Sequence, residues 1–224
     1  MTVQIDGHVL ASTTGAGSVK LSPEHDTLLD IKVTNNGPVP VTVRTLRLEG
    51  QVMGLQFFAY NTGVGATVGA SETESRQLLL DLSGLNDQAT GFMLGTVKAV
   101  DADHHVVAEQ HGLVDVRGSL QSVYGLFGLS VALLTALLFL EVLLALAREL
   151  LPTNRWRRAT RFLTPGLGLG LVINFTLAAT RVFAPGMGRW FGIAVVSAVA
   201  MFVLGYLTPT PGTEAPEPEG DPIE

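Results

Sequence analysis

The chain of 224 residues contains no cysteine. This absence excludes disulfide bonds, thiolate catalysis and Cys-ligated zinc sites. Charged residues are also scarce: they make up 15% of the chain, against about 25% in an average soluble domain. The sequence has no G-x-S-x-G nucleophile turn and no H-E-x-x-H zinc motif. We therefore expect a protein that is not an enzyme and that carries no cofactor.

The few charges are unevenly distributed along the chain. Residues 1–118 hold 7 Lys and Arg against 13 Asp and Glu, whereas residues 119–207 hold 7 Arg and only two Glu. Residues 208–224 hold five acidic residues and no base, and they are rich in Pro. This split excludes a uniform soluble globule. It also argues against nucleic acid as a partner, because the only basic cluster lies between apolar runs. We expect the acidic tail 208–224 to be disordered.

Three long apolar runs predict transmembrane helices. The first run has 24 residues and one charge, and the other two have 18 residues and none: Tyr124–Ala147, Phe162–Ala179 and Trp190–Leu207. A helix rises about 1.5 Å per residue and the hydrocarbon core is about 30 Å thick, so about 20 residues span it. The alternative is that one run is a buried soluble helix. We place the spans at about 122–148, 162–182 and 187–207.

Arginine positions predict the orientation of the spans. The connection between the first two spans carries five arginines, while the second connection carries only Arg181 and Arg189. The positive-inside rule then places the first connection in the cytoplasm of a bacterial plasma membrane. Residues 1–118 would lie outside and the tail inside; a cytoplasmic N-terminal domain is the alternative. Nothing before Val3 resembles a signal peptide, so we expect a removed leader, a start further upstream, or export driven by the first span.

The first connection is also a candidate lipid contact. An indole suits the headgroup level and arginines suit anionic phosphates, so we expect an interfacial turn or short helix that contacts anionic lipids at the cytoplasmic face. The alternative is that these residues only fix topology. The residues are Arg155, Trp156, Arg157, Arg158 and Arg161.

Small residues recur at helical spacing in the second and third spans. Gly166 and Gly170 form one G-x-x-x-G pair, and Gly188 and Gly192 form another. Such faces let helix backbones approach closely in lipid. We expect these four glycines to contact other membrane subunits.

Glu141 is the only charged residue within the first run. A carboxylate inside the hydrocarbon costs about 2.5–3.5 kcal/mol on insertion scales. Three interpretations stay open: the side chain is protonated or reaches toward the nearby arginines, it meets a group of a partner subunit, or it conducts protons or ions.

The N-terminal residues show a period of two instead of 3.6, which predicts strands. Thr27–Thr34, Val41–Leu48, Leu78–Leu82 and Gly95–Val100 are four of them, and a last pair would be His105–Ala108 with Leu113–Val116. Turn signals separate the strands, among them Asn35-Asn-Gly-Pro, Gly63–Gly69 and Asp101-Ala-Asp-His. About seven short strands without an amphipathic helix are typical of a β-sandwich. We predict such a sandwich over residues 1–118, which makes the fold class mixed: an all-β domain followed by three transmembrane helices.

The order of these segments resembles a known family. Leu28-Leu-Asp-Ile-Lys-Val-Thr-Asn-Asn-Gly-Pro, Val41-Thr-Val, Gln77-Leu-Leu-Leu-Asp-Leu, and Gly91–Val100 followed by Asp101-Ala-Asp are similar to the immunoglobulin-like, CARDB-type domains of bacterial surface proteins. The resemblance covers residues 20–118. It implies an immunoglobulin-like fold outside the cytoplasm, and it transfers no functional residue.

One segment departs from that pattern. Residues 51–70 are richer in glycine and aromatic residues than a plain turn. Phe57, Phe58 and Tyr60 in this loop belong either to the core or to an exposed contact surface. A weak metal candidate lies at a hairpin, where Asp101, Asp103 and His111 could join His104 or His105; the alternative is a solvated turn, and we predict no metal.

These features favour a non-catalytic accessory or structural subunit of a larger bacterial envelope complex. Its immunoglobulin-like domain and its helices would contact other membrane protein subunits. One alternative is a transport component in which Glu141 handles protons or ions. Another is an envelope-ligand receptor that uses the loop 51–70.

The predicted orientation can be tested directly because the chain has no cysteine of its own. Single cysteines in place of Ser71 and Thr153 should react differently with a membrane-impermeant thiol reagent on intact cells. We expect labelling at position 71 and none at position 153. The reverse pattern would place the N-terminal domain in the cytoplasm.

Overall fold

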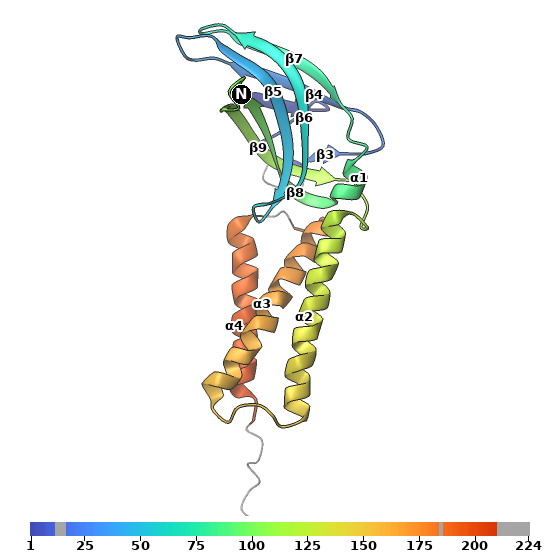
Figure 1. Ribbon diagram of the computed structural model, residues 1–224, viewed down its shortest axis with the longest axis vertical. Coiled ribbons are helices and arrows are strands. Elements are labelled where there is room, and N and C mark those ends of the chain that lie inside the picture. Colours follow the sequence, from blue (N-terminus) through green and yellow to red (C-terminus); the bar gives the residue numbers. More distant parts are fainter. Residues whose placement is uncertain (12–16, 184–185, 210–224) are drawn as a thin grey trace, which may run out of the picture.

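The computed structural model describes residues 1–11, 17–183 and 186–209, with the side chain of Met187 excepted. A β-rich region of two sheets is followed by three long apolar helices (Figure 1). The expected acidic tail lies outside the described residues beyond Pro209, as do Ala184 and Pro185 in the second connection.

The first sheet has four strands in the order β2-β1-β4-β7, and each neighbouring pair is antiparallel. Side chains alternate between its two faces, so Val3 and Ile5 of β1 are buried while Thr2 and Gln4 are exposed. The strands are β1 (Thr2–Ile5), β2 (His8–Val9), β4 (Thr27–Thr34) and β7 (Thr73–Leu80).

The second sheet has five strands in the order β3-β9-β8-β5-β6. Its first pair is parallel and the other pairs are antiparallel. The short helix α1 (Leu85–Gln88) connects β7 to β8 across the two sheets. The strands are β3 (Val19–Leu21), β5 (Val41–Val52), β6 (Leu55–Val68), β8 (Gly91–Val100) and β9 (Val106–Val116).

Two expectations about this region are wrong. Residues 51–70 are not a loop, because β5 and β6 form one long hairpin. Its turn is only Met53-Gly54, with φ values of 53° and 79°, the positive φ pair that a two-residue hairpin turn needs. Gly65, with φ of 58°, lies at a bulge in β6 instead of in a turn. The expected last strand pair is likewise the single strand β9.

Both sheets contribute to one hydrophobic core, and that core continues into the helices. Ile31 and Val97 come from the two sheets, while Tyr124, Phe175 and Trp190 belong to the helical part of the same cluster. The β region and the helices therefore share packed side chains.

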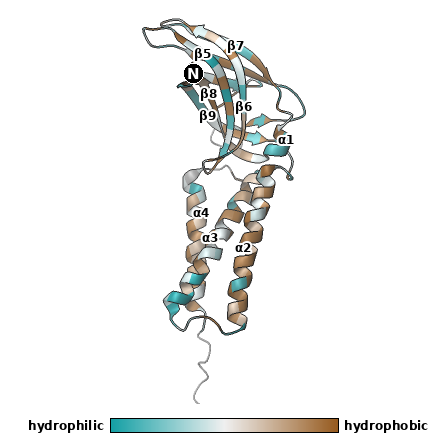
Figure 2. Ribbon diagram, in the orientation of Figure 1, coloured by the Kyte–Doolittle hydropathy of each residue, from teal (hydrophilic) through white to brown (hydrophobic). Residues whose placement is uncertain are grey.

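The three helices have the length and apolar composition of membrane spans (Figure 2). They are α2 (Val123–Ala147), α3 (Arg155–Ala179) and α4 (Met187–Leu207). The second helix begins at Arg155, earlier than expected, because Asn154 caps it by accepting bonds from the backbone N–H of Trp156 and Arg157. The arginine-rich connection thus forms the first turns of α3. α3 is the central helix, with 39% of its apolar stretch buried against 11% for α2 and 17% for α4.

Glycines let α3 and α4 pack closely. A Cβ at Gly166 would lie 2.9 Å from the Cα of Ala198, and one at Gly170 would lie 2.5 Å from the Cα of Ala194. The small-residue spacing therefore brings together two helices of this chain.

Matched glycine substitutions test this packing. Gly170→Ala should destabilise the helical part by about 1–3 kcal/mol, since the added methyl overlaps the backbone of α4. Gly192→Ala is the control, because nothing lies within 4 Å of its added Cβ; it should be neutral or stabilise by up to about 1 kcal/mol. Thermal unfolding of the full chain in detergent measures both. Equal effects would contradict the packing.

Candidate functional site

Aromatic rings cluster where the β region meets the helices. The ring of Phe57 in β6 lies 4.9 Å from that of Tyr124 and 6.0 Å from that of Phe127, both in α2. Phe175 of α3 contacts both of these rings at 5.3 Å and that of Trp190 in α4 at 5.1 Å. Edge-on and tilted arrangements at these distances are favourable. One sheet and all three helices thus meet at a single cluster, which we call the junction cluster.

Local backbone features aim these rings. The register between Gly50/Phe58 and Gln51/Gln56 shifts, which leaves Phe57 as the extra residue of a bulge in β6. Bulges redirect side chains, and here Phe57 contacts the helices while Phe58 is buried in the core over Gly50. On the helical side, Ser122 caps α2 by accepting a bond from the N–H of Gly125.

A buried carboxylate ties β9 to the connection between α3 and α4. Asp115 is 4% exposed, and its carboxylate lies 2.5 Å from Nε of Arg181 and 2.8 Å from Nη2 of Arg117. Arg181 also donates from Nη2 to the carbonyl of Val116 at 2.9 Å. Two guanidinium groups therefore compensate the buried charge, and one of them belongs to the helical part.

The same end of α3 is fixed by a buried amide and by close backbone approach. Nδ2 of Asn174 donates to the carbonyl of Gly170 at 2.9 Å and to that of Trp190 at 3.1 Å, which joins α3 to α4. At Gly91, where φ is 89°, a Cβ would lie 2.6 Å from the Cα of Ala179. The first residue of β8 can therefore touch the end of α3 only as glycine.

Sequence reasoning missed these junction residues. Arg181 was counted only for orientation, and Asp115 only as one acid among many. A signal was present in Leu113-Val-Asp-Val, where a carboxylate sits within an apolar strand and needs a partner. The identity of that partner was not readable, because Arg181 lies 66 residues further along the chain.

Glu141 lies exposed on α2, and no ion pair or hydrogen bond to its carboxylate is found among the described residues. Asn174 bonds to the carbonyl of Trp190 and Arg181 bonds to Asp115, both at the junction. The glycine pairs differ from one another. Gly166 and Gly170 are buried against the chain's own α4, so their expected contact with other subunits is replaced by an internal one. Gly188 and Gly192 face open space.

The arginine-rich end of α3 also divides into two groups. Arg155, Arg157 and Arg161 are exposed, and Trp156 is 65% exposed beside the rings of Phe202 and Tyr206. These positions suit a lipid headgroup contact. Arg158 does not, because it is 1% exposed and donates to the carbonyls of Gly205 and Pro152. Its expected lipid contact is corrected: it clamps the ends of α3 and α4 together.

The aromatic residues of the former loop are not an exposed contact surface. Phe58 is in the core, and Phe57 and Tyr60 pack against it. Burial raises the pKa of the Tyr60 hydroxyl, and the charge of Asp81 raises it further. The core interpretation of these three residues is therefore the one that fits the structure.

The hairpin acids and one histidine do come together. Carboxylate oxygens of Asp101 and Asp103 and a ring nitrogen of His105 all lie within 4.8 Å of one another. Oδ1 of Asp101 already accepts the backbone N–H groups of His105 and Asp103, and these bonds lower its pKa, the bond from His105 most. His111 bonds Thr96 and Glu109 instead. Asp103 and His105 are exposed on this turn, and their ligand atoms lie close enough to that of Asp101 to hold a metal ion.

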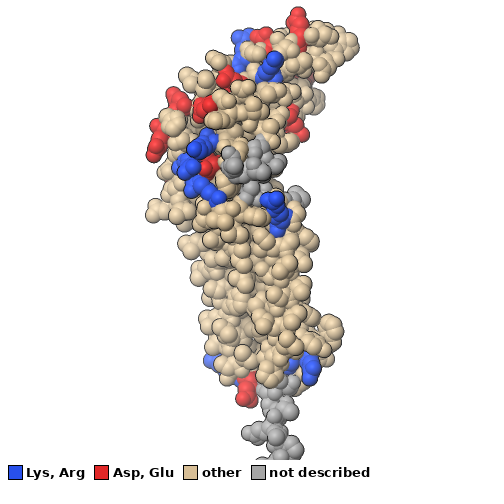
Figure 3. All heavy atoms as spheres, turned by 180° about the vertical axis from the view of Figure 1, so that it is seen from behind, with Lys and Arg blue, Asp and Glu red and all other residues tan. Residues whose placement is uncertain are grey.

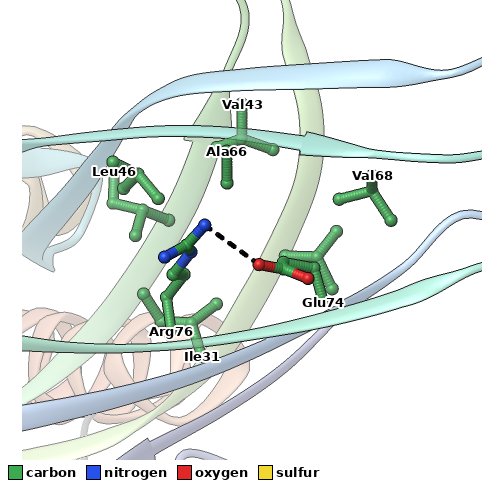
Figure 4. A pocket seen from close by; sticks show the side chains of 9 residues that line it. Ile31, Val43, Leu46, Ala66, Val68, Glu74 and Arg76 are labelled. Carbon is green, nitrogen blue, oxygen red and sulfur yellow. Dashed lines mark ion pairs between the residues drawn. The ribbon is translucent and has the colours of Figure 1, made fainter.

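A small pocket opens between the sheets at the end far from the helices (Figure 4). Aliphatic side chains of both sheets form its walls, among them Ile31, Val43 and Leu46. Among the described residues that line it, Glu74 and Arg76 are the polar ones, and they pair with each other at 3.1 Å. The described lining is otherwise aliphatic.

Comparisons with known proteins identify no family for the chain. No family model matches it, and no curated protein matches it. Among solved structures it is similar to the CARDB domain of a Pyrococcus furiosus protein, with 14% identity and a TM-score of 0.29, over 51% of this chain and 92% of that one. A crystal structure of the same domain with di-metal ions gives 14% identity, a TM-score of 0.27, and 51% and 85% coverage.

A Paenibacillus cycloisomaltooligosaccharide glucanotransferase is similar over 49% of this chain, with 15% identity and a TM-score of 0.31. This chain covers 14% of the length of that enzyme. With TM-scores of 0.27 to 0.31, these likenesses assign neither a family nor a function to the chain.

The buried ion pair at the junction can be tested by removing its charge. Asp115→Asn should destabilise the full chain by about 1.5–3 kcal/mol, because Arg181 and Arg117 lose a charged acceptor. Asp103→Asn, at an exposed position, should change stability by less than about 0.5 kcal/mol. Thermal unfolding in detergent gives the two values, and limited proteolysis of the residue 117–122 connection should be faster in Asp115→Asn alone. Equal stability of the two variants would contradict a structural role for the pair.

Proposed function

We propose that this protein is a non-catalytic accessory subunit of a larger membrane complex in the bacterial envelope. The observation that carries the proposal is the junction cluster, which fixes a β region on three helices and leaves one face of α2 uncovered. A module held in this way can position partner subunits on both sides of the membrane surface without chemistry of its own.

The proposed orientation is an immunoglobulin-like β-sandwich outside the plasma membrane, three spans, and a cytoplasmic C-terminus. Charge supports it. On the face shown in Figure 3, charged side chains gather on the β region and at the two ends of the helical part, with a neutral band between. Arg155, Arg157 and Arg161 are exposed at the end away from the β region. At the opposite end of the helices, the charge of Arg181 is paired with that of Asp115. The positive-inside rule therefore favours a cytoplasmic side for the three exposed arginines.

Two kinds of partner follow from this arrangement. Other membrane subunits would contact α2 at Glu141 and α4 at Gly188 and Gly192, where the surface is open. Anionic lipids at the cytoplasmic face would contact the exposed arginines and Trp156.

The transport alternative has less support. A path for protons or ions needs polar groups at successive depths. The hydroxyls of Ser130, Thr135 and Thr176 instead bond to the carbonyl four residues earlier in their own helices. The receptor alternative required an exposed loop at residues 51–70, and residues 55–68 form strand β6 instead.

The accessory role predicts a stable complex. The full chain, extracted from native membranes in mild detergent, should migrate on a native gel well above its own 23.7 kDa and detergent. As the control, the chain is purified away from its partners under denaturing conditions and refolded alone. It should then migrate as the single subunit. A native-membrane extract in which the chain runs alone would overturn the proposal.

A further inference from the structure

One face of α2 contacts α3, and its residues recur at alternating spacings of four and three. Tyr124, Thr135 and Val142 on this face are buried. The contact is direct: a Cβ at Gly168 of α3 would lie 2.5 Å from Oγ1 of Thr135, and one at Gly128 would lie 3.7 Å from Cβ of Phe175. This inner face accounts for how α2 packs against α3.

A second face of α2 repeats the same spacing, and none of the described residues covers it. Its residues lie one position before those of the inner face, so it is rotated from the inner face by about 100°. All of its members are exposed, with Leu134 and Leu137 at 60% and 55%. This outer seam consists of Ser130, Leu134, Leu137, Glu141 and Leu144. Alternating three and four spacing is the pattern by which one helix packs along another.

The outer seam carries the one carboxylate of the apolar stretch. Polar groups at such seams fix the register and the choice of partner. Glu141 lies seven residues before Arg148, about 10 Å along the axis, so the chain's own arginine is not beside it. No described residue compensates Glu141.

We propose that the outer seam binds a transmembrane helix of another subunit, and that this helix carries a cationic side chain at the depth of Glu141. Charge complementarity selects this occupant. A second copy of the chain would bring Glu141 against Glu141, and its Arg148 would lie as far along the axis as the chain's own. The inference rests on the proposed accessory function and specifies the contact through which it works.

A defined probe tests the charge. The full chain, labelled through Thr153→Cys and reconstituted in vesicles of phosphatidylcholine and phosphatidylglycerol, is titrated with a labelled poly-leucine transmembrane peptide. The peptide carries one lysine at the depth of Glu141, or leucine there as control, and energy transfer reports association. The chain with Glu141 should prefer the lysine peptide about tenfold. Glu141→Gln should lose the preference, because it keeps the shape but not the charge.

A position control separates the seam from the charge alone. In the double variant Glu141→Leu with Leu140→Glu, the carboxylate moves about 100° round the helix and leaves the seam. This variant should show no preference for the lysine peptide. A preference equal to that of the parent, or none in the parent, would overturn the inference.

Cysteine crosslinking tests the competing occupant in native membranes. Leu137→Cys lies on the outer seam, and Leu133→Cys is an exposed control off it. We expect no disulfide-linked dimer of the chain from either variant; a dimer from Leu137→Cys alone would show that a second copy covers the seam and would overturn the inference.

The native complex separates the two levels of the proposal. On the native gel, the Glu141→Gln chain should run apart from the complex. The parent chain, run as the control, should migrate with the complex. If the parent is in a complex that Glu141→Gln leaves intact, the inference fails and the accessory function stands. If the parent runs alone, the accessory function itself fails.

Discussion

The buried carboxylate of Asp115 is the constraint on which the arrangement of the molecule depends. A charge at 4% exposure must be compensated, and the guanidinium that does so most closely, that of Arg181, lies just beyond the last turn of α3. This pairing holds the connection between α3 and α4 against the end of β9. The junction cluster then fills the remaining space with rings from β6, α2, α3 and α4.

The consequences extend through the helical part. Once the start of α4 is held at the junction, the glycines of α3 let the two helices run in close contact, and Arg158 closes the far end by bonding the carbonyl of Gly205. The small-residue faces of α3 and α4 therefore pack against each other within the chain. α2 is left at the side, joined along one face only, and its outer seam with Glu141 stays uncovered.

Much of the secondary structure could be predicted, and the failures have physical causes. The apolar runs predicted three helices because length and composition suffice for that. Strand β4 was predictable from its alternation. The prediction of a loop at residues 51–70 was wrong. Gly63 and Gly65 are residues typical of turns, but the edge strand β6 accommodates them at a bulge. Strand β9 was predicted as two strands because Gly112 interrupts its sequence pattern. The structure explains this glycine, since a Cβ there would meet the backbone of Leu10 and Ala11.

The sequence by itself determined the order of the parts, the three apolar helices, and the presence of a carboxylate within the first of them. These are properties of residues close together in the chain. Only the tertiary structure decided which glycines pack against a neighbouring helix, and that Arg158 is buried while its neighbouring arginines are exposed. It also decided that Phe57 faces the helices while Phe58 faces the core. Each of these depends on contacts between residues far apart in sequence, such as Asp115 with Arg181, and no local pattern specifies a partner at that separation.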